Sequence, residues 1–313
     1  MKISDVKTVA NIGAGTMGHA IALQFAIHGY NVNLLDNNDA AIERGIKLID
    51  EDLKTFVENG IVDNKDVDDV LDRIDATTDY ETALTDADFV IESIVEDIDV
   101  KKQVWQRVEK FVGDEVVLAT NTSGLSPTEI ASVLKNPQRF VVAHFWNPAQ
   151  LMPLVEVVPG EKTNQTTVDF TTELITEIGK HAVPLKKESL GFVGNRIQLA
   201  VLREALSIVE KGIATPEAVD DIVKYSLGRR WSILGPIISA DLGGLDVFDN
   251  ISKYLYADLA NETGEDQALK QKVLADEKGR KSGKGFYDWQ GDEAERIVSE
   301  RDRLLLKMLK EDN

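Results

Sequence analysis

The chain has 313 residues, of which 43% are hydrophobic and 28% charged, enough for two globular domains with sizeable cores. Its formal net charge of −19 repels the phosphate backbone of nucleic acids, so we expect a small-molecule substrate and no nucleic-acid partner. The absence of cysteine excludes disulfides, a thiolate nucleophile and a cysteine-bound zinc ion.

No apolar run approaches the roughly 18 residues that a membrane-spanning helix needs. A strand pattern begins within a few residues of the N-terminus, which leaves no room for a signal peptide. We therefore expect a cytoplasmic protein with no membrane association.

Short apolar runs alternate with amphipathic helical patterns over residues 1–187, which is typical of a parallel α/β sheet. The expected strands are residues 6–12, 32–36, 89–93, 116–120, 139–145, 154–158 and 182–186. The expected helices are residues 16–28, 39–58 and 65–71, and one that Ser126 caps ahead of Pro127. This part is predicted to be a Rossmann-like, doubly wound α/β domain.

Strand patterns stop after residue 187. A long amphipathic helix is expected over residues 190–211, and another begins at Pro216 after the N-cap Thr215. Residues 228–236 are expected to be irregular, and two or three more helices follow. The sequence thus predicts a Rossmann-like domain over residues 1–187 and an all-α domain over residues 188–313.

A glycine-rich motif lies between the first expected strand and the first expected helix. In such a G-x-G-x-x-G motif the glycines permit a tight turn, close approach of a pyrophosphate, and close packing of the helix on the strand. The helix N-terminus faces the phosphate charge. A dinucleotide is therefore expected to bind at Gly13, Ala14, Gly15, Thr16, Met17 and Gly18.

Asp36 ends the second expected strand, about 20 positions after the glycine motif. Its carboxylate can accept hydrogen bonds from a ribose 2′-hydroxyl and would repel a 2′-phosphate, so NAD is favoured over NADP. A simple turn aspartate is the alternative. Asn11 is a polar residue in a strand that should be buried on both faces, and the sequence suggests no reason for it beyond a local hydrogen bond.

His144 is the candidate acid/base, at the carboxyl end of an expected strand, where doubly wound sheets bind ligands. Oxidation of a secondary alcohol needs a base for the hydroxyl proton as hydride leaves carbon, and histidine suits this near neutral pH. Glu156, in an apolar run, is costly to bury without a partner. It either orients His144 or makes a structural hydrogen bond. Structural roles alone are expected for the other histidines, His19, His28 and His181.

Two more polar residues are candidates for the site. Ser123 ends the polar turn at residues 121–123, at the same edge of the sheet, although such turns are common in any protein. Asn195 lies at the start of the expected long helix, where its amide either reaches the cleft between the domains or satisfies the helix end.

Taken together, these features resemble the L-3-hydroxyacyl-CoA dehydrogenase family in order and spacing over essentially the whole chain. The resemblance implies an NAD-dependent oxidoreductase of fatty acid metabolism, with a Rossmann-like domain and a helical domain that forms a homodimer. The matching motifs are GAGTMG, Asp36, ESIVE (92–96), NTS (121–123), HFWNP (144–148), LVEVVPG (154–160), GFVGNR (191–196) and KSGKGFYDW (281–289).

The resemblance also implies roles for individual residues. His144 would be the catalytic acid/base, oriented by Glu156, in the interconversion of a 3-hydroxyacyl-CoA and its 3-oxoacyl-CoA without a metal. Ser123 and Asn195 would hydrogen-bond the reacting oxygen and hold the substrate. The positions that line the nicotinamide half of the cofactor site are matched by Glu96, Lys101 and Asn121.

Two stretches depart from the acyl-CoA enzymes. Where the family offers a serine and lysines to CoA, residues 48–54 carry Asp50, Glu51 and Asp52, which should disfavour CoA's phosphates. The segment that contains Arg230 resembles the corresponding segment of dehydrogenases that act on free hydroxy acids such as L-gulonate and L-carnitine. In those enzymes an arginine there can bind a carboxylate. A solvated surface arginine is the alternative.

The segment ADLGGLDV (240–247) and the tail resemble the acyl-CoA enzymes, so we place an L-3-hydroxyacyl-CoA of the 3-hydroxybutyryl-CoA type first and a free hydroxy acid second. A non-catalytic, crystallin-like NAD-binding protein is a third hypothesis. The intact set of Ser123, His144, Glu156 and Asn195 argues against it.

Overall fold

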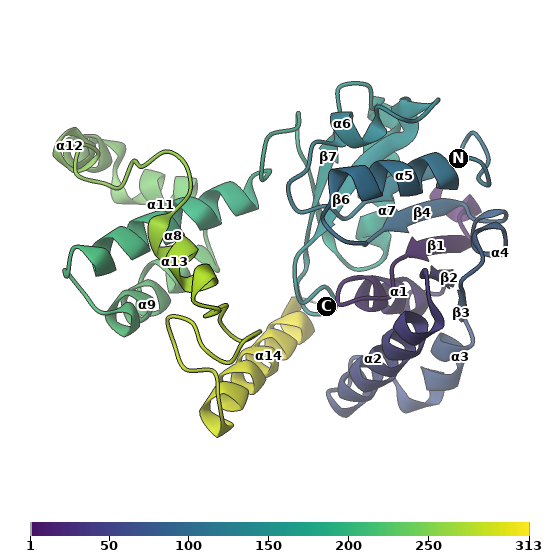
Figure 1. Ribbon diagram of the computed structural model, residues 1–313, viewed down its shortest axis with the longest axis horizontal. Coiled ribbons are helices and arrows are strands. Elements are labelled where there is room, and N and C mark those ends of the chain that lie inside the picture. The colour runs from purple at the N-terminus through teal and green to yellow at the C-terminus, as the bar shows by residue number, and fades with distance from the viewer. Residues whose placement is uncertain (1, 313) are drawn as a thin grey trace. The chain divides into compact units, whose positions relative to one another are not determined.

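The apolar runs of the first part of the chain form one sheet in the computed structural model, which describes residues 2–312. Its strand order is β3-β2-β1-β4-β5-β6-β7-β8 (Figure 1). The order reverses between β1 and β4, the kind of switch point at which doubly wound sheets bind ligands. The strands are β1 (Thr8–Ile12), β2 (Asn31–Leu35), β3 (Ile74–Thr77), β4 (Phe89–Glu92), β5 (Val117–Thr120), β6 (Phe140–Phe145), β7 (Leu154–Pro159) and β8 (His181–Pro184).

Neighbouring strands run parallel except for β6 and β7, which are antiparallel. The sheet is thus predominantly parallel, as predicted, with one antiparallel pair that the sequence pattern did not specify. Residues 146–153, which join the two strands, are too few for the helical crossover that a parallel pair needs. The antiparallel register places His144 directly opposite Glu156.

Helices connect most of the strands in this part of the chain (Figure 1). Asn38 caps α2 through the N–H of Ala41, and Ser126 caps α6 through the N–H of Glu129, as its spacing predicts. The helices are α1 (Gly18–Ile27), α2 (Asp39–Glu58), α3 (Val67–Leu71), α4 (Tyr80–Leu84), α5 (Ile98–Val108), α6 (Pro127–Ala131) and α7 (Gln165–Glu177), with 3-10 turns at Ile3–Asp5, Asn64–Asp66 and Pro137–Arg139.

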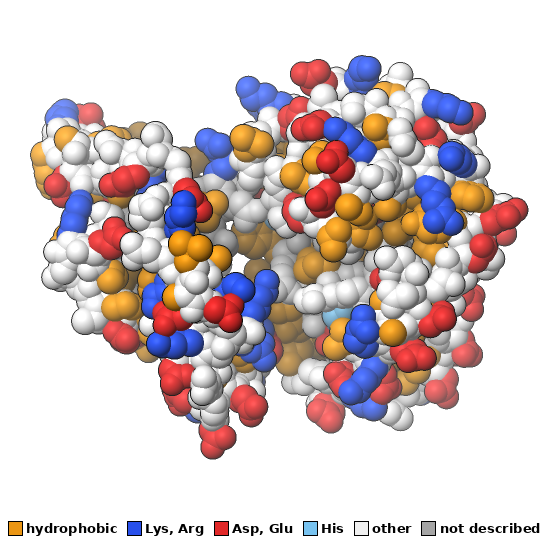
Figure 2. Space-filling model, in the orientation of Figure 1, with side chains coloured by type: hydrophobic (Ala, Val, Ile, Leu, Met, Phe, Trp, Pro, Cys, Tyr) orange, Lys and Arg blue, Asp and Glu red, His pale blue; other side chains and the backbone are white. Residues whose placement is uncertain are grey.

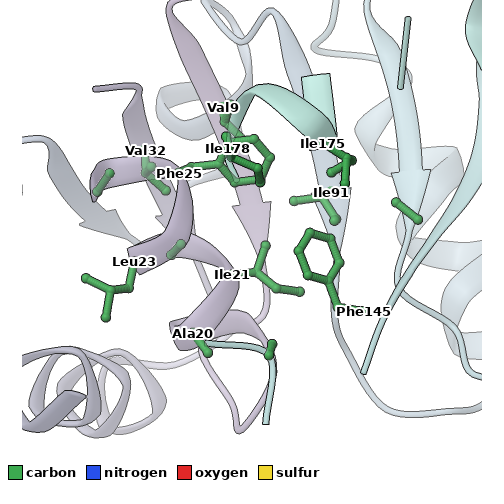
Figure 3. Packing of buried hydrophobic residues seen from close by; sticks show 14 of the residues in the cluster. Val9, Ala20, Ile21, Leu23, Phe25, Val32, Ile91, Phe145, Ile175 and Ile178 are labelled. Atoms are coloured by element: carbon green, nitrogen blue, oxygen red, sulfur yellow. The ribbon is translucent and has the colours of Figure 1, made fainter. Parts of the chain in front are cut away.

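The main core lies where α1 packs on the sheet (Figure 3). Phe25 of α1 lies close to Val9 of β1, and Ile91 of β4 lies near Ile175 of α7. Nearly every residue of α1 is buried, because this helix packs against α2 as well as against the sheet. This packing fixes the N-terminus of α1, and with it the glycine motif, against the sheet.

The chain divides into two units: unit 1 comprises Met1–Asn195 and Glu300–Asn313, and unit 2 comprises Arg196–Ser299. Unit 2 contains no strand among its described residues, in agreement with the predicted helical domain. Residues 228–236, expected to be irregular, contain part of a short helix, and four more helices follow it rather than two or three. The helices are α8 (Gly194–Glu210), α9 (Pro216–Tyr225), α10 (Leu227–Trp231), α11 (Pro236–Gly243), α12 (Leu245–Leu255), α13 (Gln267–Leu274) and α14 (Asp292–Asp312).

Among residues 2–312, none of the helices combines the length and the apolar character that crossing a membrane requires.

Candidate active site

The glycine motif forms a tight loop between β1 and α1. A Cβ on Gly13, whose φ is +102°, would lie 2.6 Å from the carbonyl oxygen of Ser93, and one on Gly18 would lie 1.8 Å from that of Gly13. At Gly15, by contrast, a Cβ would meet nothing within 4 Å. The N–H groups of Gly15 and Thr16 have no acceptor among the described residues. The loop therefore presents free donors at a helix N-terminus, which fits the pyrophosphate of a dinucleotide.

Asn11 explains how the loop keeps its shape. This side chain is fully buried in β1, and its Nδ2 donates to the carbonyl oxygens of Gly13 at 2.9 Å and Gly18 at 3.2 Å. The sequence suggested only a local hydrogen bond for Asn11, and its bond to Gly13 is of that kind. The signal was present as a polar residue in a strand that is buried on both faces.

Asp36 follows β2 and binds the glycine loop directly. Its Oδ2 accepts from the N–H of Ala14 at 2.8 Å, and its Oδ1 accepts from that of Asn37 at 2.7 Å. The cap of α2 is Asn38, so Asp36 is not needed for that purpose. Each carboxylate oxygen retains a lone pair that a ribose hydroxyl can use.

His144 and Glu156 lie on the adjoining strands β6 and β7. The His144 Nδ1 is 2.9 Å from Oε2 of Glu156, and the two residues are 5% and 2% exposed. Among the described residues, Nε2 of His144 has no hydrogen-bond partner. With Nδ1 facing a carboxylate, the neutral ring carries its proton there and leaves the lone pair on Nε2.

Glu156 accepts hydrogen bonds on both of its oxygens. Oε1 accepts from the N–H groups of Val193 at 3.0 Å and Gly194 at 3.1 Å, and Oε2 also accepts from Nε1 of Trp146 at 3.4 Å. A Cβ at Gly194 would lie 2.2 Å from the Trp146 ring, so glycine lets this backbone approach. Burial raises the pKa of Glu156, but the bonds from His144, Gly194 and Val193 outweigh it and hold the pKa below its ordinary value. The carboxylate is therefore charged at neutral pH.

The turn at residues 121–123 lies beside β6. Asn121 Oδ1 accepts from the N–H of Phe145 at 2.8 Å, which joins this turn to the end of the His144 strand. Asn195 Nδ2 donates to the carbonyl oxygen of Ser123 at 2.8 Å. Ser123 itself is exposed, and Asn195 is half-buried. Unit 1 thus brings together Ser123, His144, Glu156 and Asn195.

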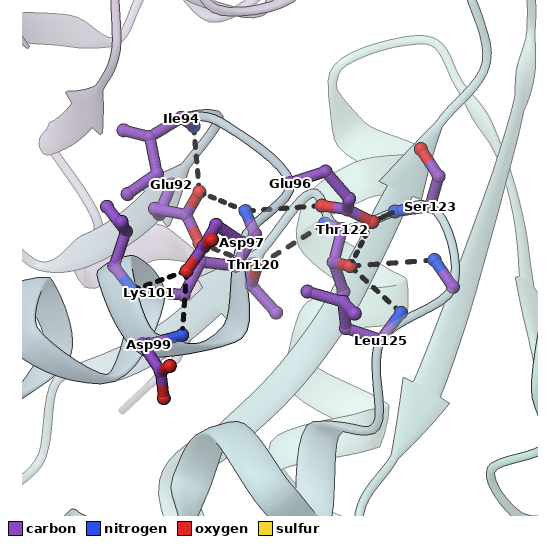
Figure 4. Close-up of polar contacts among 12 residues, drawn as sticks. Glu92, Ile94, Glu96, Asp97, Asp99, Lys101, Thr120, Thr122, Ser123 and Leu125 are labelled. Atoms are coloured by element: carbon purple, nitrogen blue, oxygen red, sulfur yellow. Dashed lines mark hydrogen bonds and ion pairs between the residues drawn. The ribbon is translucent and has the colours of Figure 1, made fainter.

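Glu96 fixes the backbone of this turn (Figure 4). Its Oε1 accepts from the Thr122 hydroxyl at 2.6 Å and from the Ser123 N–H at 2.8 Å. The Glu96 side chain is 43% exposed, so it also faces solvent at the edge of the site.

Lys101 lies behind Glu96 in a buried cluster (Figure 4). Its ammonium is 2.6 Å from Oε1 of Glu92 and 3.5 Å from Oε2 of Glu96, and its side chain is 1% exposed. Glu92, fully buried, also accepts from the Thr120 hydroxyl at 2.7 Å and from the Ile94 N–H at 2.7 Å. The sequence gave Glu92, the first residue of the ESIVE motif, no role of its own, because two of its partners, Lys101 of α5 and Thr120 of β5, lie in other elements of the fold.

Three predicted residues remain to be placed. Arg230 is exposed on α10 in unit 2. Met17 is half-buried beneath the glycine loop, and Thr16 is exposed at its rim.

Comparisons with known proteins match the chain in two parts. Residues 8–189 match the model of the 3-hydroxyacyl-CoA dehydrogenase NAD binding domain, and residues 191–289 match that of the C-terminal domain. The chain is 38% identical over 282 residues to a 3-hydroxybutyryl-CoA dehydrogenase of Clostridioides difficile, covering 90% of this chain and 99% of the relative.

A second relative carries a different name. The chain is 33% identical over 302 residues to the 5-formyl-3-hydroxy-2-methylpyridine 4-carboxylate 5-dehydrogenase of Mesorhizobium japonicum, covering 96% of each. A solved structure of a 5-dehydrogenase for this pyridine carboxylate, an NAD+ dependent dismutase, matches with a TM-score of 0.90 at 32% identity over 98% of both chains.

Proposed function

Because the chain belongs to the 3-hydroxyacyl-CoA dehydrogenase family, whose members are NAD-dependent oxidoreductases acting on CH–OH groups, we propose that it interconverts an L-3-hydroxyacyl-CoA and its 3-oxoacyl-CoA. A substrate of the 3-hydroxybutyryl-CoA type is the first candidate, which would place the enzyme in fatty acid metabolism. The observation that carries the proposal is the buried His144–Glu156 pair, 2.9 Å apart, with a free Nε2 on the histidine.

NAD is the cofactor of the family, and the glycine loop fits it. We propose that Gly13, Gly15 and Gly18, with Thr16 and Met17, hold the pyrophosphate and that Asp36 holds the adenosine ribose. Bound NAD supplies the hydride acceptor for oxidation and, once reduced, the hydride donor. We assign the nicotinamide half to Glu96, Lys101 and Asn121, with Lys101 acting from behind Glu96 because its own side chain is 1% exposed.

His144 is proposed to move the proton. Nε2 takes the proton of the substrate's 3-hydroxyl during oxidation and returns it to the developing alkoxide during reduction. The ring becomes an imidazolium when it holds this proton, and the charged Glu156 beside Nδ1 stabilises that form. Because β-strands carry both residues, the ring keeps its orientation throughout the cycle.

Ser123 and Asn195 are proposed to bind the reacting oxygen. The exposed Ser123 hydroxyl and the second N–H of the Asn195 amide can both donate to an oxygen as it gains negative charge. Glu96 keeps Ser123 in place through its backbone N–H.

The carboxylates of α2 are less of an obstacle to CoA than their sequence suggests. Asp50 pairs with Lys54 at 2.5 Å, and Glu51 pairs with Lys47 at 3.6 Å. Asp52 is directed at His19 rather than at solvent. Lys and Arg side chains also lie among the more numerous Asp and Glu side chains on the face drawn in Figure 2. This local neutralisation supports an acyl-CoA substrate.

A free carboxylic acid is the second candidate, because the pyridine carboxylate dehydrogenase structure matches with a TM-score of 0.90. In this alternative the exposed guanidinium of Arg230 binds the substrate carboxylate. For a free hydroxy acid the chemistry at His144 would be the same, and a formyl group would first have to add water to give a gem-diol with a hydroxyl proton.

The test compares substrates in parallel assays. NADH oxidation is followed with acetoacetyl-CoA, and NAD reduction with L-gulonate, L-carnitine, free 3-hydroxybutyrate and the 5-formylpyridine carboxylate. We expect turnover with acetoacetyl-CoA, lowered about 10³-fold in H144A and retained in R230Q. Turnover with a free acid alone, lost in R230Q, would replace the first candidate by the second.

We further propose a homodimer, formed through unit 2. Ile233 and Ile237 are each 79% exposed, and Leu242 and Leu245 are 73% and 61% exposed. An exposed apolar surface of this kind, over α10 to α12, is typical of a protein–protein interface. Size-exclusion chromatography with light scattering should give twice the chain mass for the wild type and the chain mass for I237K. A monomeric wild type would refute this proposal.

A further inference from the structure

The ring of His19, just after the glycine motif, lies between two hydrogen-bond acceptors. Its Nδ1 is 2.8 Å from the carbonyl oxygen of Gly15, and its Nε2 is 3.2 Å from Oδ2 of Asp52 on α2. A neutral imidazole has one N–H and can serve only one of them, whereas an imidazolium donates to both. Since His19 is 5% exposed, water does not replace the missing donor. The geometry therefore fits a positively charged ring paired with Asp52.

Asp52 is held in place from a second side. Its Oδ1 accepts from Nε2 of Gln150 at 3.0 Å, and Gln150 belongs to the segment that follows the His144 strand. One carboxylate thus joins α1, α2 and the β6–β7 connection. The anchor of the His19 ring is fixed by tertiary structure rather than by a mobile surface side chain.

The bond from His19 to Gly15 also orients the glycine loop. The same carbonyl oxygen accepts the backbone N–H of His19 at 3.1 Å, so two donors hold it towards the helix. A trans peptide is planar, and its N–H points opposite to its C=O. The N–H of Thr16, in the same peptide unit as this carbonyl, is therefore directed away from the His19 ring, and it has no acceptor among residues 2–312.

We propose that His19, as an imidazolium anchored by Asp52, is a positioning residue for the pyrophosphate of NAD. It sets the direction of the Thr16 N–H and adds a positive charge beneath the loop, where a helix N-terminus already favours an anion. This replaces the purely structural role expected from sequence. The proposal concerns the cofactor site of the family and holds for either substrate considered above.

Binding measurements without turnover test the proposal. Dissociation constants for NADH and for ADP, which retains the pyrophosphate, are measured by fluorescence and calorimetry, with adenosine as the ligand that lacks phosphate. Because each variant removes a charge-assisted bond, we expect H19Q and D52N to weaken NADH and ADP binding about 10-fold and to leave adenosine unchanged. Matched controls are H181Q, an exposed histidine, and D50N, an exposed carboxylate on α2, and both should bind like the wild type.

Two further readouts separate positioning from a general loss of structure. H19Q should raise the KM for NAD while keeping kcat at saturating NAD, and the double variant should bind no more weakly than either single variant, since the two residues act as one unit. Equal weakening of adenosine and ADP, or unchanged ADP binding, would overturn the proposal. If the variants do not fold, the protonation state of the His19 ring in the wild type is measured by nitrogen NMR. A neutral ring would refute the proposal.

Discussion

Replacing Glu156 by glutamine preserves the shape of the side chain but removes its charge and one of its two acceptor oxygens. In the wild type, Oε2 accepts from His144 and Trp146, and Oε1 accepts from the N–H groups of Val193 and Gly194. A glutamine has one oxygen and one NH2 group. Whichever way the amide turns, one of these pairs of donors faces a group that cannot accept.

The size of the effect follows from when His144 is charged. A hydrogen bond to a charged group contributes about 1.5–3 kcal/mol, and here its full value arises only once the ring holds the substrate proton. At about 1.4 kcal/mol for each factor of ten, kcat for alcohol oxidation in E156Q should fall about 10- to 100-fold. The KM for NAD should stay near the wild-type value, because Glu156 does not contact the glycine loop. Unpaired donors should also lower the free energy of unfolding by about 1–3 kcal/mol.

Initial rates and thermal unfolding of E156Q are best measured beside E188Q. Glu188 likewise accepts several hydrogen bonds, from the Ser126 hydroxyl at 2.8 Å and from the Thr128 N–H at 3.3 Å and hydroxyl at 2.5 Å, but it does not contact His144. We expect E188Q to lose stability and keep kcat. A folded E156Q with wild-type kcat, or an equal loss of kcat in E188Q, would refute the proposed acid/base pair.

Three more predictions concern turnover, cofactor choice and pH. H144A should lower kcat about 10³-fold while NADH binds as in the wild type; a smaller loss than tenfold would remove His144 from proton transfer. D36A should shift the ratio of kcat/KM for NAD and NADP towards NADP, and an unchanged ratio would count against the ribose assignment. Burial lowers the pKa of Lys180 to about 8 from 10.5, although its ammonium donates to the carbonyl oxygens of Ala149 and Met152 at 2.7 and 3.1 Å. The unfolded chain therefore binds more protons between pH 8 and 10.5, so the unfolding free energy of the wild type should rise relative to K180M across that window, by up to about 3 kcal/mol. Chemical denaturation at stepped pH measures this difference, and a flat or falling difference would contradict it.

The sequence predicted features that depend on local backbone requirements. Gly13 and Gly18 can be recognised from the spacing of the glycine motif alone, and the structure gives the physical reason, since a Cβ at either position would collide with a neighbouring carbonyl oxygen. The fold class was predicted correctly for the same kind of reason, since the alternation of apolar runs and amphipathic helices is local. The half-exposed β3 and the short α4 lack such patterns and were not anticipated, and neither were the longer helices α5 and α7.

The candidate site depended more on contacts between distant segments. The sequence offered His144 and Glu156 as a possible pair, and only the antiparallel register of β6 and β7 places them opposite each other. Glu92 and Asn11 gained meaning only from their partners, as did the acidic stretch of α2. Before folding, Asp52 is one of three adjacent carboxylate-bearing residues, and in the structure it holds His19 and Gln150.

The sequence by itself determined where the glycine loop lies and which chemistry its side chains can perform, because backbone strain and residue type belong to each position alone. The tertiary structure decided which charges meet, which donors remain free and which nitrogen of His144 holds the proton. These outcomes depend on distances of about 3 Å between residues far apart in the chain, and only the packing of the strands and helices sets such distances.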